Sequence, residues 1–268
     1  MDSNDTQTSA EETSAQNGNG ELSHSDKMIG IFTEPAKTFE NVSRYPLKSM
    51  DWFLPILILM LVAGLMQRIS MMNEEVYFEV MKKQTEAIQK QVEAGNLTQE
   101  QADQQIEATE TFMQGPIGWV TTIAGALIVG FIIFFFISLI YWACVKLFLK
   151  GEGGYTNALV AGGLTAYITI LQMLITGILT FLFGTLVKDT SLAALLETER
   201  TTYAGWALAK IDPINIWSYI VLSIGLTKLF KSQNTGKYYV LVFSLWIVGG
   251  FLLFQLAKSV PFLESFIQ

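Results

Sequence analysis

Residues able to do chemistry are few in this chain, which has one cysteine, Cys144, and one histidine, His24. A lone cysteine excludes an intrachain disulfide and a cysteine metal cluster. His24 lies in a polar N-terminal segment, so the apolar remainder of the chain lacks the usual general base, metal ligand and pH-sensitive group. We therefore predict no catalytic residue, no metal and no cofactor.

Motifs for nucleotide, zinc and nucleic-acid binding are missing as well. The sequence has no Walker loop, no Gly-x-Gly-x-x-Gly that opens a soluble helix, no His-Glu-x-x-His and no Cys-x-x-Cys. Gly151, Gly153 and Gly154 lack the Lys-Ser/Thr that completes a phosphate loop, and a flexible turn explains them. No basic stripe with stacking aromatics occurs, so a nucleic-acid partner is not expected.

One polar pattern recurs inside an apolar stretch, and it supplies the candidate site. Its polar members follow one another at spacings of 4, 3, 4 and 4: Thr165, Thr169, Gln172, Thr176 and Thr180. On a helix they fall within an arc of about 80°, and Gly162 extends the same face. Such faces allow close helix packing and interhelical hydrogen bonds, so we expect Thr169 and Gln172 to face the bundle interior. The alternative is a polar groove for a lipid headgroup or a small solute.

The elements that carry this face must be membrane helices. Hydrophobic residues make up 51% of the 268 residues and charged residues only 15%, and the mean hydropathy is +0.38. We predict an all-α, polytopic integral membrane bundle with about five transmembrane helices. The expected spans are residues 52–66, 117–145, 158–187, 213–227 and 238–257. The first and fourth are shorter than the about 20 residues that cross a bilayer, so they must extend into their flanks.

Charge placement suggests how the bundle is oriented. The formal net charge is −7, and six excess acids lie in residues 1–26, which we interpret as a disordered acidic tail. Counts of Lys and Arg on the two sides of the membrane are nearly even, but those on the side of the N-terminus lie in short connections, whereas the others are spread over longer loops that also carry acids. We therefore predict a cytoplasmic N-terminus and an extracytoplasmic C-terminus. No charged residue lies in the middle of a span, which disfavours coupled transport but leaves uncoupled passage open.

Two helical segments outside the spans are expected. After residue 26, Thr33 is a candidate N-cap and Pro35 a first-turn residue of a short interfacial helix, whose alternative is an ordinary amphipathic connector. Between spans one and two, residues 73–114 predict a helical hairpin, with a capping box at Thr98 and Gln101 and a turn at Gly95. The hairpin is either a solvated spacer or an acidic surface that docks a partner.

Three segments resemble the Yip family of multispanning membrane proteins, named after interaction with Ypt/Rab GTPases. They are residues 30–39, with Pro35 and Phe39 leading to the first span; the glycine-containing turn 151–155; and residues 212–226, which resemble the fourth span of bacterial members. The resemblance covers about residues 28–260 and implies five spans and no enzymatic activity. The Asp-Leu-Tyr-Gly-Pro type motif of eukaryotic, Rab-binding relatives is absent between Ser25 and Asp51, so a bacterial cytoplasmic-membrane branch is implied.

These observations together predict a noncatalytic membrane adaptor or scaffold. Besides the lipid bilayer, we expect unidentified protein partners that bind through residues 73–114 or the N-terminal tail, and an oligomer remains an open alternative. The second functional hypothesis is an uncoupled lipid scramblase or small-solute passage protein that uses the polar face of the third span.

Overall fold

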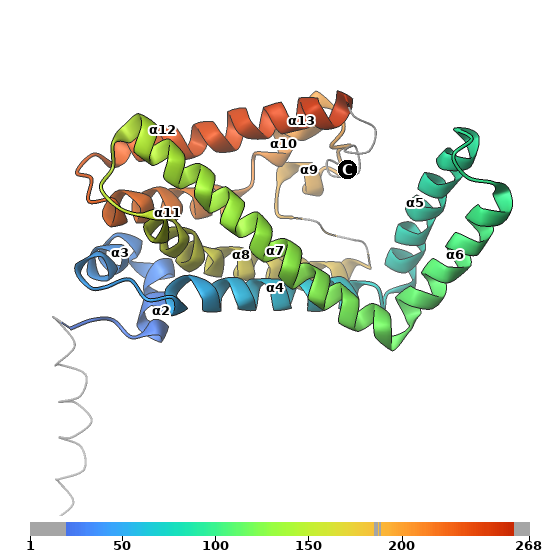
Figure 1. Cartoon of the computed structure of the whole chain (residues 1–268), viewed down its shortest axis with the longest axis horizontal. Coiled ribbons are helices and arrows are strands. Elements are labelled where there is room, and N and C mark those ends of the chain that lie inside the picture. Colours follow the sequence, from blue (N-terminus) through green and yellow to red (C-terminus); the bar gives the residue numbers. More distant parts are fainter. Residues whose placement is uncertain (1–19, 185–186, 188, 260–268) are drawn as a thin grey trace, which may run out of the picture.

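The computed structural model describes residues 20–184, 187 and 189–259, and these residues form helices and no strand. The all-α prediction is therefore confirmed. Long helical segments lie along the longest axis of the molecule, and the segment Pro116–Cys144 runs obliquely across the others (Figure 1). They are α4 (Met50–Ser70), α7 (Pro116–Cys144), α8 (Tyr155–Phe183), α11 (Pro213–Leu229), and α12 (Thr235–Ser244) continued through η2 (Leu245–Gly249) into α13 (Gly250–Ser259).

Four of these segments are long and apolar enough to cross a membrane, and a fifth crossing results if α10 (Tyr203–Ala209) and α11 count as one bent span. The two helices meet at an angle of 60°. The first span is 21 residues long and so includes both flanks of the expected 52–66 stretch. The short fourth span stays at 17 residues, because α10 turns aside before Pro213.

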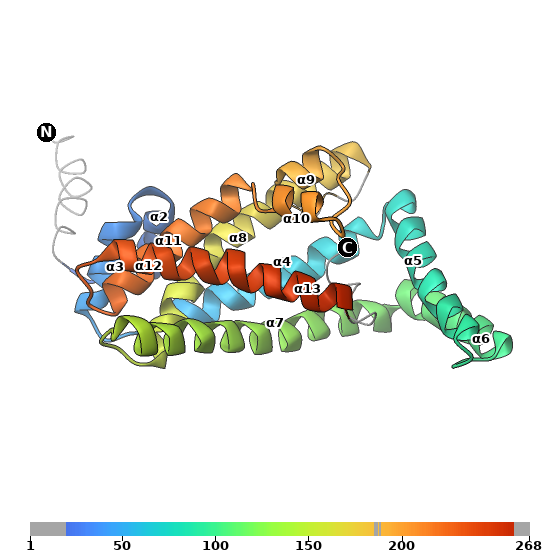
Figure 2. The same ribbon diagram turned by 90° about the horizontal axis from the view of Figure 1, so that it is seen from above.

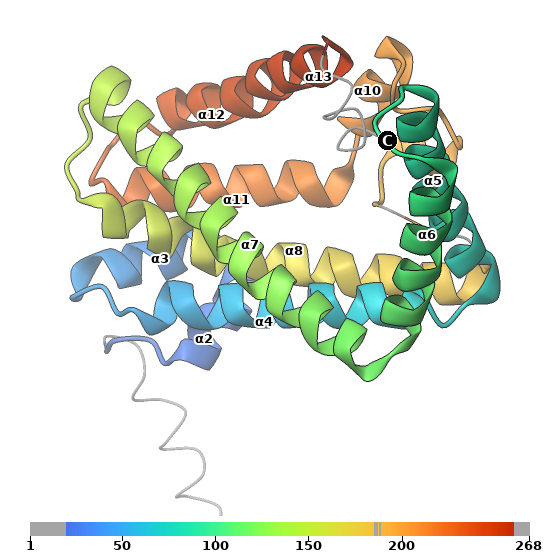
Figure 3. The same cartoon turned by 45° about the vertical axis from the view of Figure 1, so that its right-hand side comes forward.

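Helix α8 is the centre of the bundle and packs against α4, α7 and α11. Figure 3 shows α4 and α8 side by side. Their close approach depends on Gly163, because a Cβ atom added there would lie 2.3 Å from the Cα atom of Trp52. On the α7 side, the corresponding atom on Gly162 would contact Phe134 and Ser138. Small residues thus set the helix spacing, as expected where lipid supplies no hydrophobic driving force between helices.

The outward surfaces of α7 and α13 are apolar. Ile128, Ile132 and Phe136 of α7 are largely exposed, as are Leu252 and Leu253 of α13. Soluble monomers rarely expose an apolar surface of this extent, because its contact with water is unfavourable. In a membrane, lipid tails cover such a surface. The exposed surface therefore fits a protein whose solvent is a bilayer.

The N-terminal segment differs from the sequence prediction. Helix α2 (His24–Thr33) begins before residue 27, because Ser23 and Asp26 form a capping box. Thr33 ends α2 and does not cap α3 (Pro35–Arg44), although Pro35 is in the first turn of α3 as expected. Residues 20–26 of the predicted acidic tail are therefore placed against the bundle, while residues 1–19 lie outside the described part of the chain.

Helix α3 presents a buried apolar face to α11. Phe39 and Val42 are buried there, and the Phe39 ring lies so close to Gly225 that an added Cβ atom would be 2.7 Å from its Cζ atom. The amphipathic pattern of the segment is confirmed. Its apolar side is covered by the bundle.

The predicted hairpin is present as α5 (Glu74–Glu93) and α6 (Gln99–Gln114). Thr98 and Gln101 form the expected capping box, and Gly95 has a φ of 75°, which glycine adopts without strain. Figure 2 shows the hairpin extending beyond one end of the long helices, opposite α2 and α3. The short helix α9 (Leu192–Leu195) and α10 lie toward the hairpin end of the bundle (Figure 1).

Candidate functional site

The polar face of α8 lies largely inside the bundle. Thr165, Gln172, Thr176 and Thr180 are buried, and Gly162 and Thr169 are half-buried. The threonines mostly satisfy local backbone groups: the Thr165 hydroxyl donates to the Ala161 carbonyl and the Thr176 hydroxyl donates to the Met173 carbonyl. The Thr180 hydroxyl accepts from the backbone N–H of Val187. These threonines therefore act mainly within their own helix and the loop that follows it.

Gln172 is the member of this face that reaches another segment. Its Nε2 atom donates to Oδ2 of Asp212 at 2.7 Å and to the hydroxyl oxygen of Thr190 at 3.2 Å. Thr190 in turn donates to Oδ1 of Asp212 at 2.7 Å. Side chains from α8, from the loop after it and from the start of α11 thus meet at one carboxylate.

Asp212 is fully buried and is the N-cap of α11. The backbone N–H groups of Ile214 and Asn215 donate to its Oδ1 atom, and the Asn215 side chain donates to Oδ2. With Gln172 and Thr190, five hydrogen bonds reach the carboxylate. A negative charge is favourable there because the unsatisfied N–H groups and the dipole of a helix N-terminus carry partial positive charge.

This Asp212 cluster, comprising Asp212, Gln172, Thr190 and Asn215, marks the bend between α10 and α11. Membrane proteins use broken helices where polar backbone can line a site or be satisfied by neighbouring side chains. In the described residues every polar partner of Asp212 is a donor without charge, and no group of three or more His, Cys, Asp or Glu side chains could hold a metal ion. The cluster thus satisfies the polar groups that meet at the bend between α10 and α11.

Helical periodicity predicted Gln172 as a site residue, whereas Asp212, Thr190 and Asn215 were not predicted. The available signal was Asp212 followed by Pro213, which is a typical N-cap and first-turn pair. The spacing of the polar residues identified one face of a helix, but it does not show which loop folds against that face. Whether the α8 face serves packing alone or also forms a groove stays a prediction.

A second buried polar cluster lies at the opposite end of the bundle, and it corrects the expectation for His24. Lys27 and Asp51 are both buried, with Nζ 2.8 Å from Oδ2. The His24 ring has Nε2 2.7 Å from the Tyr167 hydroxyl oxygen and Nδ1 3.3 Å from Oδ1 of Asp51. His24 therefore contacts α8 and the start of α4, because the capping box places it in the first turn of α2.

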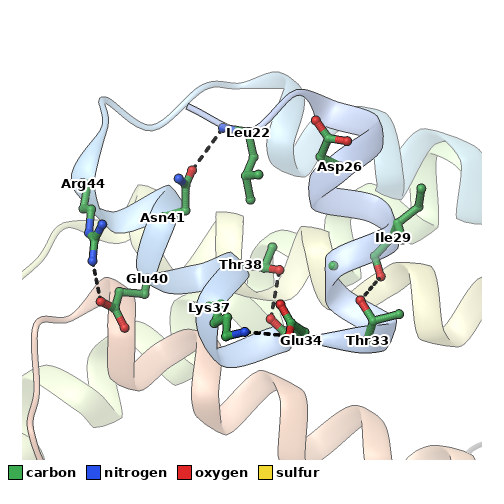
Figure 4. A pocket seen from close by; sticks show the side chains of 11 residues that line it. Leu22, Asp26, Ile29, Thr33, Glu34, Lys37, Thr38, Glu40, Asn41 and Arg44 are labelled. Carbon is green, nitrogen blue, oxygen red and sulfur yellow. Dashed lines mark hydrogen bonds and ion pairs between the residues drawn. The ribbon is translucent and has the colours of Figure 1, made fainter. Parts of the chain in front are cut away.

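A pocket of about 480 Å³ opens between α2 and α3. Figure 4 shows Glu34 paired with Lys37 and Glu40 paired with Arg44 on its wall. Glu40 also accepts from Lys228 at 3.1 Å, and hydrogen bonds from Lys228 and then Arg44 hold the pKa of its carboxyl below the ordinary value. The charges of the wall are thus largely neutralised within the protein.

The helical architecture, the lipid-compatible outer surface and the sealed polar clusters define a polytopic helical membrane protein. More specifically, the chain belongs to the Yip1 domain family, whose model matches residues 29–256. It is similar to the "Membrane protein YknW" of Bacillus subtilis (strain 168), with 27% identity over 222 residues that cover 81% of this chain and 84% of the relative. No solved structure matches the chain significantly. The predicted family membership is confirmed.

Proposed function

We propose that this protein is a noncatalytic adaptor of the bacterial cytoplasmic membrane, with the N-terminus in the cytoplasm and the α5–α6 hairpin outside. The hairpin is the observation that carries the proposal. It extends past the end of the bundle (Figure 2), and it begins and ends beside the spans α4 and α7. A structure of this kind holds a surface at a fixed place outside the bilayer.

The surface in question is an acidic face of α6. Four acidic residues and no basic residue occur in this helix, at spacings of 3, 4 and 3, so they share one side: Glu100, Asp103, Glu107 and Glu110. All four are exposed. The buried side chains that the structure describes in the hairpin are apolar instead: Val76, Met81, Ile88 and Ala102. An exposed acidic face of this kind attracts a partner with a basic surface.

Charge reversal tests this docking surface directly. Asp103→Lys combined with Glu107→Lys should abolish recovery of the partner when the tagged protein is purified from crosslinked membranes. The matched control is Glu86→Lys combined with Glu93→Lys, which makes the same charge change at exposed positions of α5. Equal recovery of one defined partner by both variants, or recovery by neither wild type nor control, would rule out docking on α6.

The proposed orientation has a separate test. In a Cys144-substituted chain, cysteine at position 96 in the hairpin turn should react with membrane-impermeant maleimide in intact cells, while cysteine at position 152 should not. Asn96 and Glu152 are both exposed, so neither result depends on unfolding. Labelling of position 152 alone would show that the orientation is the opposite of the one proposed.

Uncoupled passage of lipid or solute is the second candidate, because the α8 face meets a broken helix at the Asp212 cluster. In liposomes, a passage protein would move fluorescent lipid between leaflets, and Thr169→Leu combined with Gln172→Leu would stop this movement without unfolding the protein. The adaptor proposal predicts no movement above that of protein-free vesicles. Movement that the double variant abolishes would favour passage.

A further inference from the structure

The outer end of α4 holds a buried cation without a carboxylate partner in the described part of the chain. Arg68, in the last turn of α4, is 6% exposed. Its NH2 atom donates to the backbone carbonyl of Met113 at 2.8 Å, and its guanidinium carbon lies 4.8 Å from the centre of the Trp119 ring. The Nε atom is buried and has no hydrogen-bond partner among the described residues. A buried donor left in this condition is costly unless a ligand satisfies it.

Arg68 lines a pocket of about 510 Å³ at the base of the hairpin. The rest of the wall is mainly apolar or aromatic: Met71, Met72, Tyr77, Phe78, Met113 and Trp119. Met72 and Phe78 are 73% and 71% exposed, so large apolar groups surround the entrance. Glu74 is the other charged residue of the wall, but it is exposed and hence better screened by water than the buried guanidinium.

The position of this pocket narrows the class of ligand. Arg68 and Trp119 lie near the hairpin ends of the spans α4 and α7, where side chains meet the polar headgroups of a bilayer. A guanidinium fits phosphate oxygens with several donors in one plane, and the exposed methionine and phenylalanine side chains favour an acyl chain. A small soluble anion would satisfy the cation but would leave the apolar wall uncovered.

We propose that this pocket binds an anionic phospholipid, whose phosphate is held by Arg68 and whose acyl chain lies along Met72 and Phe78. The bound lipid would brace the junction between α4, the hairpin and α7, because Arg68 already contacts the backbone at Met113. This site is distinct from the acidic face of α6 and from the polar face of α8. The lipid-binding proposal is therefore tested independently of the adaptor proposal.

The test uses the full chain in detergent, titrated with phosphatidylglycerol and examined by native mass spectrometry. Wild type should retain phosphatidylglycerol in preference to diacylglycerol, which lacks the phosphate. Arg68→Gln should weaken this retention about tenfold or more, as expected for loss of charge-assisted hydrogen bonds. The matched control is Arg200→Gln, since Arg200 is already paired with Asp189 at 2.7 Å, and it should retain lipid as wild type does.

A second variant covers the case in which Arg68→Gln fails to fold. Phe78→Ser changes an exposed side chain, so the helix bundle should form, but it removes part of the apolar wall and should weaken lipid retention severalfold. Unchanged retention in both folded variants, or equal retention of phosphatidylglycerol and diacylglycerol, would overturn the proposal. Displacement of the lipid by millimolar inorganic phosphate would also overturn it, because the site would then be one for a soluble anion.

Discussion

The N-terminal end of the bundle and the α5–α6 hairpin differ in how their charged residues are satisfied. At the N-terminal end, α2 and α3 fold back on the spans, Lys27 and Asp51 pair out of contact with solvent, and Glu40 joins α3 to Lys228 of α11. At the other end, the hairpin leaves the bundle and exposes the acidic face of α6. The first arrangement satisfies its charges within the chain, whereas the second leaves them available. The difference suggests that the N-terminal end stabilises the fold and that the hairpin end meets other molecules.

The largest effect should come from the buried ion pair. Asp51→Asn leaves the Lys27 ammonium buried without its nearest carboxylate, which ordinarily costs about 3–5 kcal/mol in the free energy of unfolding. We expect the lower part of that range, since Glu21 lies 3.6 Å from the same ammonium. Reversible unfolding in detergent measures this loss of unfolding free energy, and Asp103→Asn on the hairpin is the control. A loss below about 1 kcal/mol would show that this pair does not hold the N-terminal end together.

Close packing of α4 on α8 should give the next largest effect. Gly163→Ala places a methyl group against the backbone of Trp52, and overpacking of this kind costs about 1–3 kcal/mol. Gly125→Ala in α7 is the matched control, because no described atom beyond the neighbouring residues and backbone of its own helix lies within 4 Å of its added Cβ. Thermal unfolding should separate the two variants. Equal melting temperatures would mean that α4 and α8 are not in contact as described.

The Asp212 cluster should matter less. Gln172→Leu removes two hydrogen bonds but leaves the carboxylate with its other donors, so a cost of about 0.5–2 kcal/mol is expected. Thr176→Val is the control, since this hydroxyl donates only to the backbone of its own helix. If Gln172→Leu lost transport while its stability stayed normal, the cluster would belong to a passage site.

The smallest effect is expected from the ion pairs at Glu40. The pKa of this carboxyl is depressed in the folded protein, so its contribution is present above the ordinary carboxyl pKa and is lost as the pH falls through the folded value. Glu40→Gln should therefore lower the melting temperature slightly at neutral pH and make no difference in acid. Glu34→Gln is the control, because its partner Lys37 lies in the same helix segment. A difference between Glu40→Gln and wild type that persisted in acid would exclude an electrostatic cause.

Sequence patterns predicted features that depend on neighbours along the chain. The apolar runs, the Thr98 capping box and the turn at Gly95 are local, and all three are present in the structure. Contacts between distant segments were not predictable in this way. His24 was placed in a tail because nothing in a polar segment shows that its first helix folds onto Tyr167, more than one hundred residues away.

The candidate site shows the same limit. Periodicity placed Gln172 on one face of a helix, since every residue of that face lies in a single segment. Its partners Thr190 and Asp212 come from a loop and from the start of another helix. In the sequence Arg68 is only a charged residue at the end of an apolar run, and the fold brings Trp119 and the carbonyl of Met113 to its guanidinium.

The adaptor function is tested most directly by photo-crosslinking in living cells. A photoreactive amino acid at position 107, on the acidic face of α6, should yield one adduct of defined mass with a second protein. The same amino acid at position 86, exposed on α5, should yield much less of it. This adduct should disappear when Asp103→Lys is added to the position 107 variant. Equal adducts at both positions, or none at position 107 in a correctly inserted protein, would contradict the account.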